Sequence, residues 1–219
     1  MIQTRWLRVG GGAGIVFVVL VWAYVLWAPL MVSTPEPPFD GPAKDWLAYA
    51  QATRSADIVA APLLTIALFA FLVFAVSLSV KLRSSDNGPH VPSTLVIVMA
   101  GLLVGLYMAA SGVSLAASFR VADLTATSAA LLYGLDNGLF VMTWLAIGGL
   151  LAAAGVGGLT SRTLPGWLAW PALFVGVGFL VAAGLPLTAL WFAPYVLFYV
   201  WVVAASIVLI RSKPSPRPA

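Results

Sequence analysis

Asp136 is the residue whose surroundings most favour a chemical role. It lies in the stretch Leu131–Phe140, and it is the only carboxylate with apolar sequence on both sides of it. A carboxylate placed mid-membrane costs about 2.5 to 3.5 kcal/mol on insertion scales, so such residues persist mainly where they have a function. Asn137 follows directly, and Gly134 and Gly138 flank the pair. The functional hypothesis is a proton carrier or a polar ligand contact in an outward-facing cavity.

A structural role for Asp136 is the alternative hypothesis, and the depth of the residue separates the two. An apolar span of about 20 to 24 residues counted back from Gly157 begins near Gly134, which places Asp136 at the outer edge of the membrane. There the dipole of a helix N-terminus stabilises negative charge by about 0.3 to 1 kcal/mol. Arg54 and Arg120 are the outer cations available to pair with it. The sequence leaves both the ion pair and the functional site open.

The sequence lacks the residues that several kinds of chemistry require. The chain has no cysteine and one histidine, His90, in a polar loop, which excludes thiol chemistry and a pair of haem-ligating histidines within the chain. The acids are too scattered along the sequence to predict a metal site, and no lysine lies inside an apolar segment. No nucleophile-elbow, phosphate-loop or dinucleotide motif is present. We therefore expect no metal, no cofactor and no catalytic residue.

The elements that must position Asp136 are membrane helices. Of the 219 residues, 62% are hydrophobic and 8% are charged, against about 25% charged in a soluble domain. The first apolar run exceeds the 7 to 15 residues of a signal peptide, so it is interpreted as a retained helix. The sequence predicts a single membrane domain over 1–219 with an all-α, polytopic fold, in which six transmembrane helices span about 10–32, 57–80, 93–118, 128–157, 166–184 and 187–210.

The segments between and within these helices carry further expectations. In the first outer loop, Ala43, Trp46, Leu47 and Ala50 follow a helical period, which predicts a short amphipathic interfacial helix with Trp46 at headgroup level. The alternative is a loop helix packed on the end of the bundle. Small residues recur along helix 93–118, from Gly101 to Ala116, and predict a central, closely packed helix. The remaining polar groups of that helix, Tyr107, Ser111 and Ser114, are interpreted as structural. Pro194 is expected to kink the last helix, and 211–219 forms a basic, proline-rich tail.

Charge predicts the orientation. With six crossings, eight of the eleven Lys and Arg residues fall on the side of the two termini and three on the other side. By the positive-inside rule we expect a plasma-membrane protein with cytoplasmic N and C termini. An internal echo also appears, because Asp57 and Arg83 are separated by the same 26 residues as Asp136 and Arg162. This spacing suggests two similar helical hairpins, and the repeat is a hypothesis.

Three features carry a resemblance to known proteins. They are the opening Arg8–Phe17 of the first helix, the outer segment Pro35–Pro38, and Leu135–Phe140. In these features the chain resembles the small six-helix integral membrane proteins of actinobacteria that form a family of uncharacterised function. The resemblance implies the fold and a membrane location, and it implies no activity.

Three functions remain in view. The leading hypothesis is a non-catalytic accessory or assembly subunit that binds other membrane components, with the bilayer, a membrane protein partner or a second copy as its partners and no nucleic acid. The second is a small proton-coupled transporter of an unknown solute that uses Asp136. The third is an intramembrane lipid-modifying enzyme. Candidate ligand- or proton-binding residues are Asp136, Asn137, Asp57, Arg120 and Arg54.

Overall fold

The computed structural model describes residues 2–32, 34–83, 90–185 and 192–212, and within these ranges the chain is all-α. Six helices are each long and apolar enough to cross a membrane, so the predicted polytopic fold is confirmed. Besides them the described residues include the short 3-10 helix η1 (Val121–Asp123). The helices are α1 (Ile2–Met31), α2 (Ala43–Arg83), α3 (His90–Phe119), α4 (Ala126–Ser161), α5 (Gly166–Ala183) and α6 (Phe192–Ile210).

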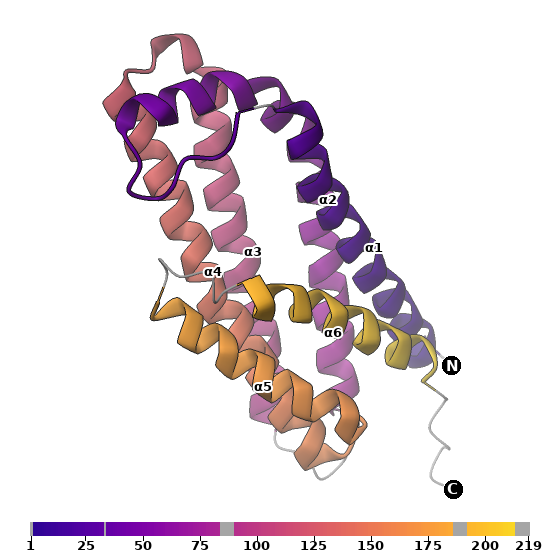
Figure 1. Cartoon of the computed structure of the whole chain (residues 1–219). Coiled ribbons are helices and arrows are strands. Elements are labelled where there is room, and N and C mark those ends of the chain that lie inside the picture. The colour runs from indigo at the N-terminus through magenta and orange to yellow at the C-terminus, as the bar shows by residue number, and fades with distance from the viewer. Residues whose placement is uncertain (1, 33, 84–89, 186–191, 213–219) are drawn as a thin grey trace, which may run out of the picture.

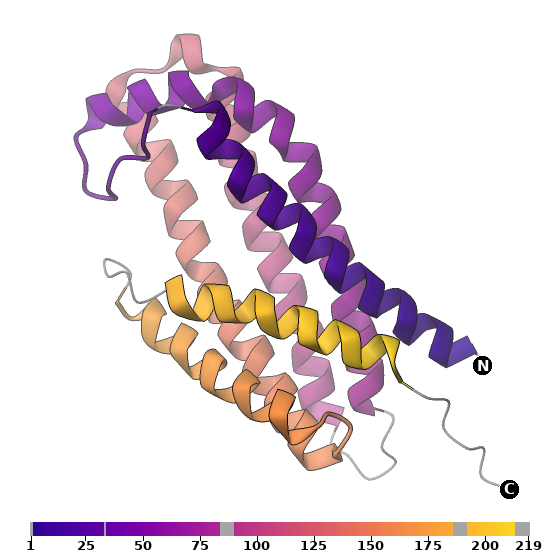
Figure 2. The ribbon, with the colours of Figure 1, turned by 45° about the vertical axis from the view of Figure 1, so that its right-hand side comes forward.

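Helix length divides the bundle into two halves. α1 packs on α2, α2 on α3, and α3 on α4, while α5 packs on α4 and α6 on α1. α5 and α6 have 18 and 19 residues, against 41 in α2 and 36 in α4. At about 1.5 Å per residue they are half as long as α2 or less. Figures 1 and 2 show α5 and α6 crossing the long helices near the end that holds both termini, which we call the inner end. The opposite, outer end is formed by α1 to α4.

The predicted amphipathic helix exists, but its surroundings differ from the expectation. Residues from Ala43 onward form the first part of α2, which turns across the outer end of α3 and α4 before it descends (Figure 1). Pro62 lies inside α2 and removes one backbone donor, so a bend near it costs little. Trp46 is only 2% exposed and packs with Ala50, Ala117, Ala129 and Tyr133. The segment therefore packs on the end of the bundle, as the alternative interpretation expected, and the position of Trp46 at headgroup level stays a prediction.

Close helix packing comes from glycines outside the predicted stripe. A Cβ atom at Gly148 of α4 would lie 3.0 Å from the Gly176 carbonyl oxygen of α5, so these two backbones touch. Gly10, Gly11 and Gly14 of α1 likewise face α2 or α6 at close range. The stripe of α3 is different: Gly101, Gly105 and Gly112 have no atom within 4 Å of such a Cβ atom, and all three are exposed. The prediction that this stripe packs inside the bundle is wrong.

The helix boundaries extend past the apolar spans. α1 begins at Ile2 and α4 reaches Ser161, because the polar residues that flank a membrane span continue its helix. His90, expected in a loop, is the first residue of α3. The described α6 begins at Phe192, so Pro194 falls in its first turn, and the preceding residues that the predicted kink would involve lie outside the described part of the chain. Residues 84–89, 186–191 and 213–219, including most of the predicted tail, lie outside the described residues.

The hydrophobic core lies in the inner half and is rich in aromatic rings. Phe17 of α1 is 4.8 Å from Phe71 of α2 and 6.3 Å from Phe198 of α6, measured between ring centroids. The Trp201 indole donates a hydrogen bond of 2.9 Å to the Leu168 carbonyl and ties α6 to α5. Aromatic pairs of this kind contribute about 0.5 to 1.5 kcal/mol each beyond their buried area. This packed layer separates the outer half of the molecule from its inner end.

Candidate binding cavity

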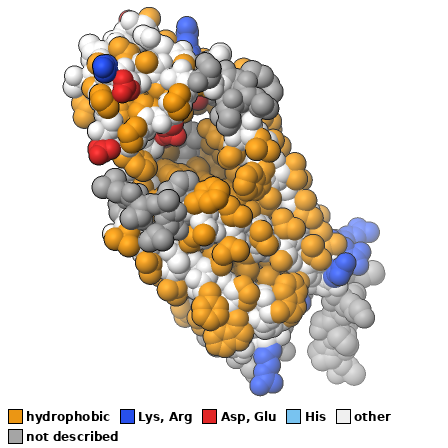
Figure 3. All heavy atoms as spheres, viewed as in Figure 1, with side chains coloured by type: hydrophobic (Ala, Val, Ile, Leu, Met, Phe, Trp, Pro, Cys, Tyr) orange, Lys and Arg blue, Asp and Glu red, His pale blue; other side chains and the backbone are white. Residues whose placement is uncertain are grey.

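A cavity of about 570 Å³ lies in the outer half, above the aromatic core. Its walls come from α1, α2, α3, α4 and α6, together with the Pro-rich segment before α2. Figure 3 shows the molecule hollowed between its outer part, which carries acidic side chains, and its apolar body. Ligand pockets in proteins have volumes of about 300 to 1,000 Å³, so this space suits a small molecule.

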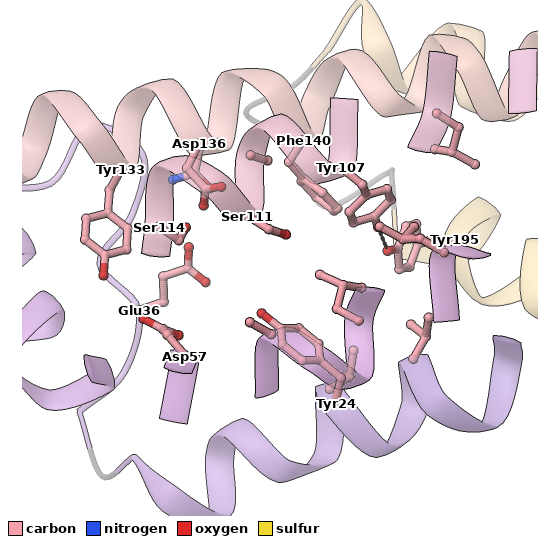
Figure 4. Close-up of a pocket in the computed structure, with 18 of the residues that line it drawn as sticks. Tyr24, Glu36, Asp57, Tyr107, Ser111, Ser114, Tyr133, Asp136, Phe140 and Tyr195 are labelled. Atoms are coloured by element: carbon pink, nitrogen blue, oxygen red, sulfur yellow. Dashed lines mark hydrogen bonds between the residues drawn. The ribbon is translucent and has the colours of Figure 1, made fainter. Parts of the chain in front are cut away.

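Three carboxylates from three different segments gather in this cavity. Glu36 comes from the segment between α1 and α2, Asp57 from α2, and Asp136 from α4. Figure 4 shows their carboxyl groups directed into the same end of the space. The described residues that line the cavity include no lysine, arginine or histidine. This end of the cavity is therefore strongly negative when the acids are ionised.

Asp136 does not form the ion pair considered in the sequence analysis. Arg120 pairs instead with Asp123, at 2.7 Å from Nε to Oδ2, and both side chains are well exposed. Arg54 is exposed and does not line the cavity. In place of an arginine, the Ser114 hydroxyl of α3 lies beside the Asp136 carboxylate (Figure 4). The ion-pair hypothesis is thus wrong in this structure, while Asp136 does reach an open space.

Asn137 and Asp57, two further candidates, also line the cavity. Asn137 is 8% exposed, so its amide belongs to the buried part of the wall. Asp57 accepts a hydrogen bond of 3.0 Å from the Ser118 hydroxyl of α3. Of the five candidate residues, the structure brings together Asp136, Asn137 and Asp57 and leaves Arg54 and Arg120 outside.

Glu36 is the acidic member that the sequence reasoning missed. It lies in the segment Pro35–Pro38, where the prolines hold the backbone extended and bring the side chain to the cavity mouth. Its side chain stays exposed toward the cavity, while protein surrounds it on other sides and raises its pKa above the usual value through desolvation. The only signal in the sequence was an acid among prolines in the longest outer loop.

The opposite end of the cavity is aromatic. Tyr107 of α3 and Tyr195 of α6 are hydrogen-bonded through their hydroxyls, and the Phe140 ring of α4 lies 6.0 Å and 5.8 Å from them, edge to face. The Tyr24 hydroxyl and the Ser111 hydroxyl both point into the space between the two ends (Figure 4). Tyr107, Ser111 and Ser114, interpreted from sequence as structural, all line the cavity.

The outer end of α2 covers the acidic end of the cavity. Tyr133 lies between this segment and the carboxylates, and its ring stacks on Trp46 at 5.4 Å between centroids. Its hydroxyl is 3.3 Å from the Thr53 hydroxyl. The packing of the amphipathic segment therefore positions an aromatic side wall beside Asp57.

The structure shows where the two Asp–Arg pairs of the possible internal repeat lie. Asp57 and Asp136 line the same cavity, whereas Arg83 and Arg162 lie at the inner ends of α2 and α4. Arg83 donates a hydrogen bond of 2.9 Å to Ser93 at the start of α3, and Arg162 caps α4 in a left-handed conformation, with φ of 54°. The two arginines thus have different local roles, and the repeat stays a hypothesis.

No family model, no curated protein and no solved structure matches this chain. The fold and the cavity together define a multi-pass α-helical membrane protein with an acidic and aromatic cavity in its outer half. The interpretation of its role rests on that cavity.

Proposed function

We propose that the protein is a small proton-coupled transporter that binds its solute in the outer cavity and exchanges it for protons at Asp136. One observation carries the proposal: the Asp136 carboxylate opens into a ligand-sized space beside the Ser114 hydroxyl, and the described residues that line this space include no cation. A carboxylate neutralised by a fixed arginine stays ionised and does not exchange protons readily. Intramembrane acids without such a partner are typical of proton relays in transporters.

The closed side of the cavity supports the same proposal. The Tyr107–Tyr195 pair and the aromatic layer below it separate the carboxylates from the inner end. Transport requires α6, which supplies Tyr195, to move relative to α3, which supplies Tyr107. α6 is short and crosses the long helices near the inner end (Figure 2), so it can tilt without unpacking the outer half. In this proposal the structure represents the state that is open at the outer end.

The proposed orientation places both termini in the cytoplasm of a cell bounded by a plasma membrane. Gly11 of α1 approaches Ile210 of α6, so both ends of the described chain lie at the inner end. Arg83 ends α2 and Arg162 caps α4 at that same end, as the positive-inside rule requires of the cytoplasmic side. Extracellular and cytoplasmic labelling of cysteines introduced near Arg5 and near Phe39, both of which are exposed, tests this orientation.

Proton flux in proteoliposomes tests the proposed function. The full chain is reconstituted with a pH-sensitive dye inside, and three probes are added outside: benzyltrimethylammonium, benzenesulfonate and sorbitol. At least one probe is expected to drive a proton flux that Asp136→Asn abolishes. Asp123→Asn is the matched control, because Asp123 is an exposed acid outside the cavity. Flux in Asp136→Asn equal to that of the parent protein would refute the role of Asp136.

An accessory-subunit function is the second candidate, and the exposed stripe of α3 favours it. Gly101, Gly105 and Gly112 present an open small-residue surface of the kind that membrane helices use for mutual packing. Gly105→Ile should leave the isolated chain stable, because nothing lies within 4 Å of the added Cβ. In this second reading the substitution removes a co-purifying membrane protein, and unchanged co-purification would count against a docking role for the stripe.

A further inference from the structure

We infer that the cavity binds a lipophilic organic cation, with its charged group among Glu36, Asp57 and Asp136 and its apolar body against the Tyr107–Tyr195 end. The inference names the solute class of the proposed transporter. The further consequence, that the bound cation crosses the membrane, rests on the proposed function. Binding itself depends only on the cavity, so it can be tested separately from transport.

The sign of the charge follows from the lining. Three carboxylates face one end of the space, and the described lining residues contribute no basic side chain. Like charges held together in an environment of low dielectric constant repel one another, and a bound positive charge relieves that repulsion. An anionic solute would be repelled by all three ionised acids. The site therefore selects cations.

The cation is organic, because the acids are not arranged to coordinate a metal ion. Among the described residues no three acidic or histidine side chains form a group that could hold a metal. Calcium and magnesium require oxygen ligands at about 2.0 to 2.6 Å that converge on one point. Carboxylates that surround a wider space suit a larger and more diffuse positive charge, such as a substituted ammonium group.

The aromatic rings match such a charge and the apolar body attached to it. The faces of Tyr and Phe rings attract ammonium groups within about 6 Å, and Tyr24 and Tyr133 are the labelled rings beside the acids (Figure 4). The rings of the opposite end meet the apolar body. Tyr24 projects between the acids and the Tyr107–Tyr195 pair, and Phe140 closes the far wall (Figure 4).

The uneven distribution of charge also limits the number of charges on the solute. All three acids lie at one end, while the other end offers rings and hydroxyls. A linear polyamine would place its second ammonium group against the aromatic end, where no carboxylate compensates the loss of water. The geometry thus points to one cationic group joined to an apolar body.

Calorimetric titration of the full-length protein in lipid nanodiscs tests the inference. The probes are benzyltrimethylammonium, benzenesulfonate, spermidine and calcium chloride. Benzyltrimethylammonium is expected to bind, with at least tenfold weaker binding in Asp136→Asn and in Glu36→Gln. Glu36 lies in a loop, so Glu36→Gln keeps the test valid if substitution in α4 prevents folding. Asp123→Asn should bind as the parent protein does.

A ring substitution tests the aromatic end separately. Phe140→Leu should weaken benzyltrimethylammonium binding several-fold, and Phe174→Leu should not, because Phe174 is exposed on α5 and does not line the cavity. Tighter binding of benzenesulfonate would overturn the charge assignment. Tighter binding of spermidine would overturn the single charge, and displacement of benzyltrimethylammonium by calcium would overturn the organic assignment.

The failures of the two proposals are distinguishable. Cation binding in nanodiscs without proton flux in proteoliposomes would refute transport and leave the solute class standing. Proton flux driven by benzenesulfonate or sorbitol, and not by benzyltrimethylammonium, would refute the solute class and leave transport standing. Absence of binding by every probe, in a protein that keeps its thermal unfolding transition, would overturn the inference.

Discussion

Gly176→Ala tests the packing that holds α5 against α4, and thereby the position of the short helices below the cavity. A Cβ atom at Gly176 would lie 2.9 Å from the Gly148 carbonyl oxygen and 3.0 Å from the Ala152 amide nitrogen. Both neighbours are backbone atoms of α4, so no side chain can rotate away. The substitution is expected to push the two helices apart.

The size of the effect follows from these distances. Ordinary contacts of a Cβ atom begin at 3.4 Å, so the overlap is about half an ångström. Overpacking of this kind costs about 1 to 3 kcal/mol. Alanine also gains about 0.8 to 1 kcal/mol of helix propensity over glycine, which offsets part of the cost. Gly105→Ala is the matched control, because it carries the same propensity gain and meets no atom within 4 Å.

Unfolding of the two variants in mixed detergent micelles, followed by tryptophan fluorescence, provides the measurement. Gly105→Ala is expected to be as stable as the parent protein or slightly more stable. Gly176→Ala should lie about 1 to 3 kcal/mol below Gly105→Ala, since the propensity terms cancel in that difference. Equal free energies of unfolding would show that α4 and α5 do not meet at this pair of glycines.

Two further predictions concern the outer half. Trp46→Ala should destabilise the protein by about 3 to 5 kcal/mol in thermal unfolding, because it leaves a cavity where the 2%-exposed indole packs on Tyr133. Trp170 is exposed on α5, so Trp170→Ala should cost far less. Equal losses of stability would contradict the docking of the outer part of α2. Burial raises the pKa of Glu36, so the folded state favours the protonated carboxyl group. Protonation of Glu36 therefore stabilises the folded protein below the pKa of the unfolded state. This stabilisation is lost as pH rises through the pKa of the folded state. The parent protein should therefore gain stability relative to Glu36→Gln as pH falls from neutral toward the ordinary pKa of a glutamate, and a difference in melting temperature that stays constant with pH would refute this assignment.

Much of the fold could be predicted from sequence because lipid imposes a local rule. Each membrane span must satisfy its own backbone hydrogen bonds, so apolar length alone predicts a helix. The six spans were predicted in this way, and so was the helical period around Trp46. The same local rule could not say what each helix face meets. The glycines of α3 and those of α4 look alike in sequence, yet Gly105 is exposed and Gly148 is packed against a backbone.

The candidate site divides in the same way. Asp136 is conspicuous because an acid surrounded by apolar residues is costly, and that cost can be read from its neighbours in the chain. The neighbours of Asp136 in the chain do not show which group it meets in space. Arg120 has the opposite charge, but it pairs with Asp123 at the exposed η1 turn. Glu36 gave no signal, since an acid in a polar loop is unremarkable until a proline-rich segment is seen to enter the cavity.

The sequence by itself determined that the chain is a bundle of membrane helices, that most positive charge lies toward its termini, and that Asp136 needs an explanation. Those properties depend on the free energy of transferring each segment from water to lipid. That free energy is a sum over residues that are neighbours in the chain. Only the tertiary structure decided that Glu36, Asp57 and Asp136 meet opposite the Tyr107–Tyr195 pair. That meeting depends on contacts between residues far apart in the chain, and it arises where α5 and α6 are too short to fill the outer half of the bundle.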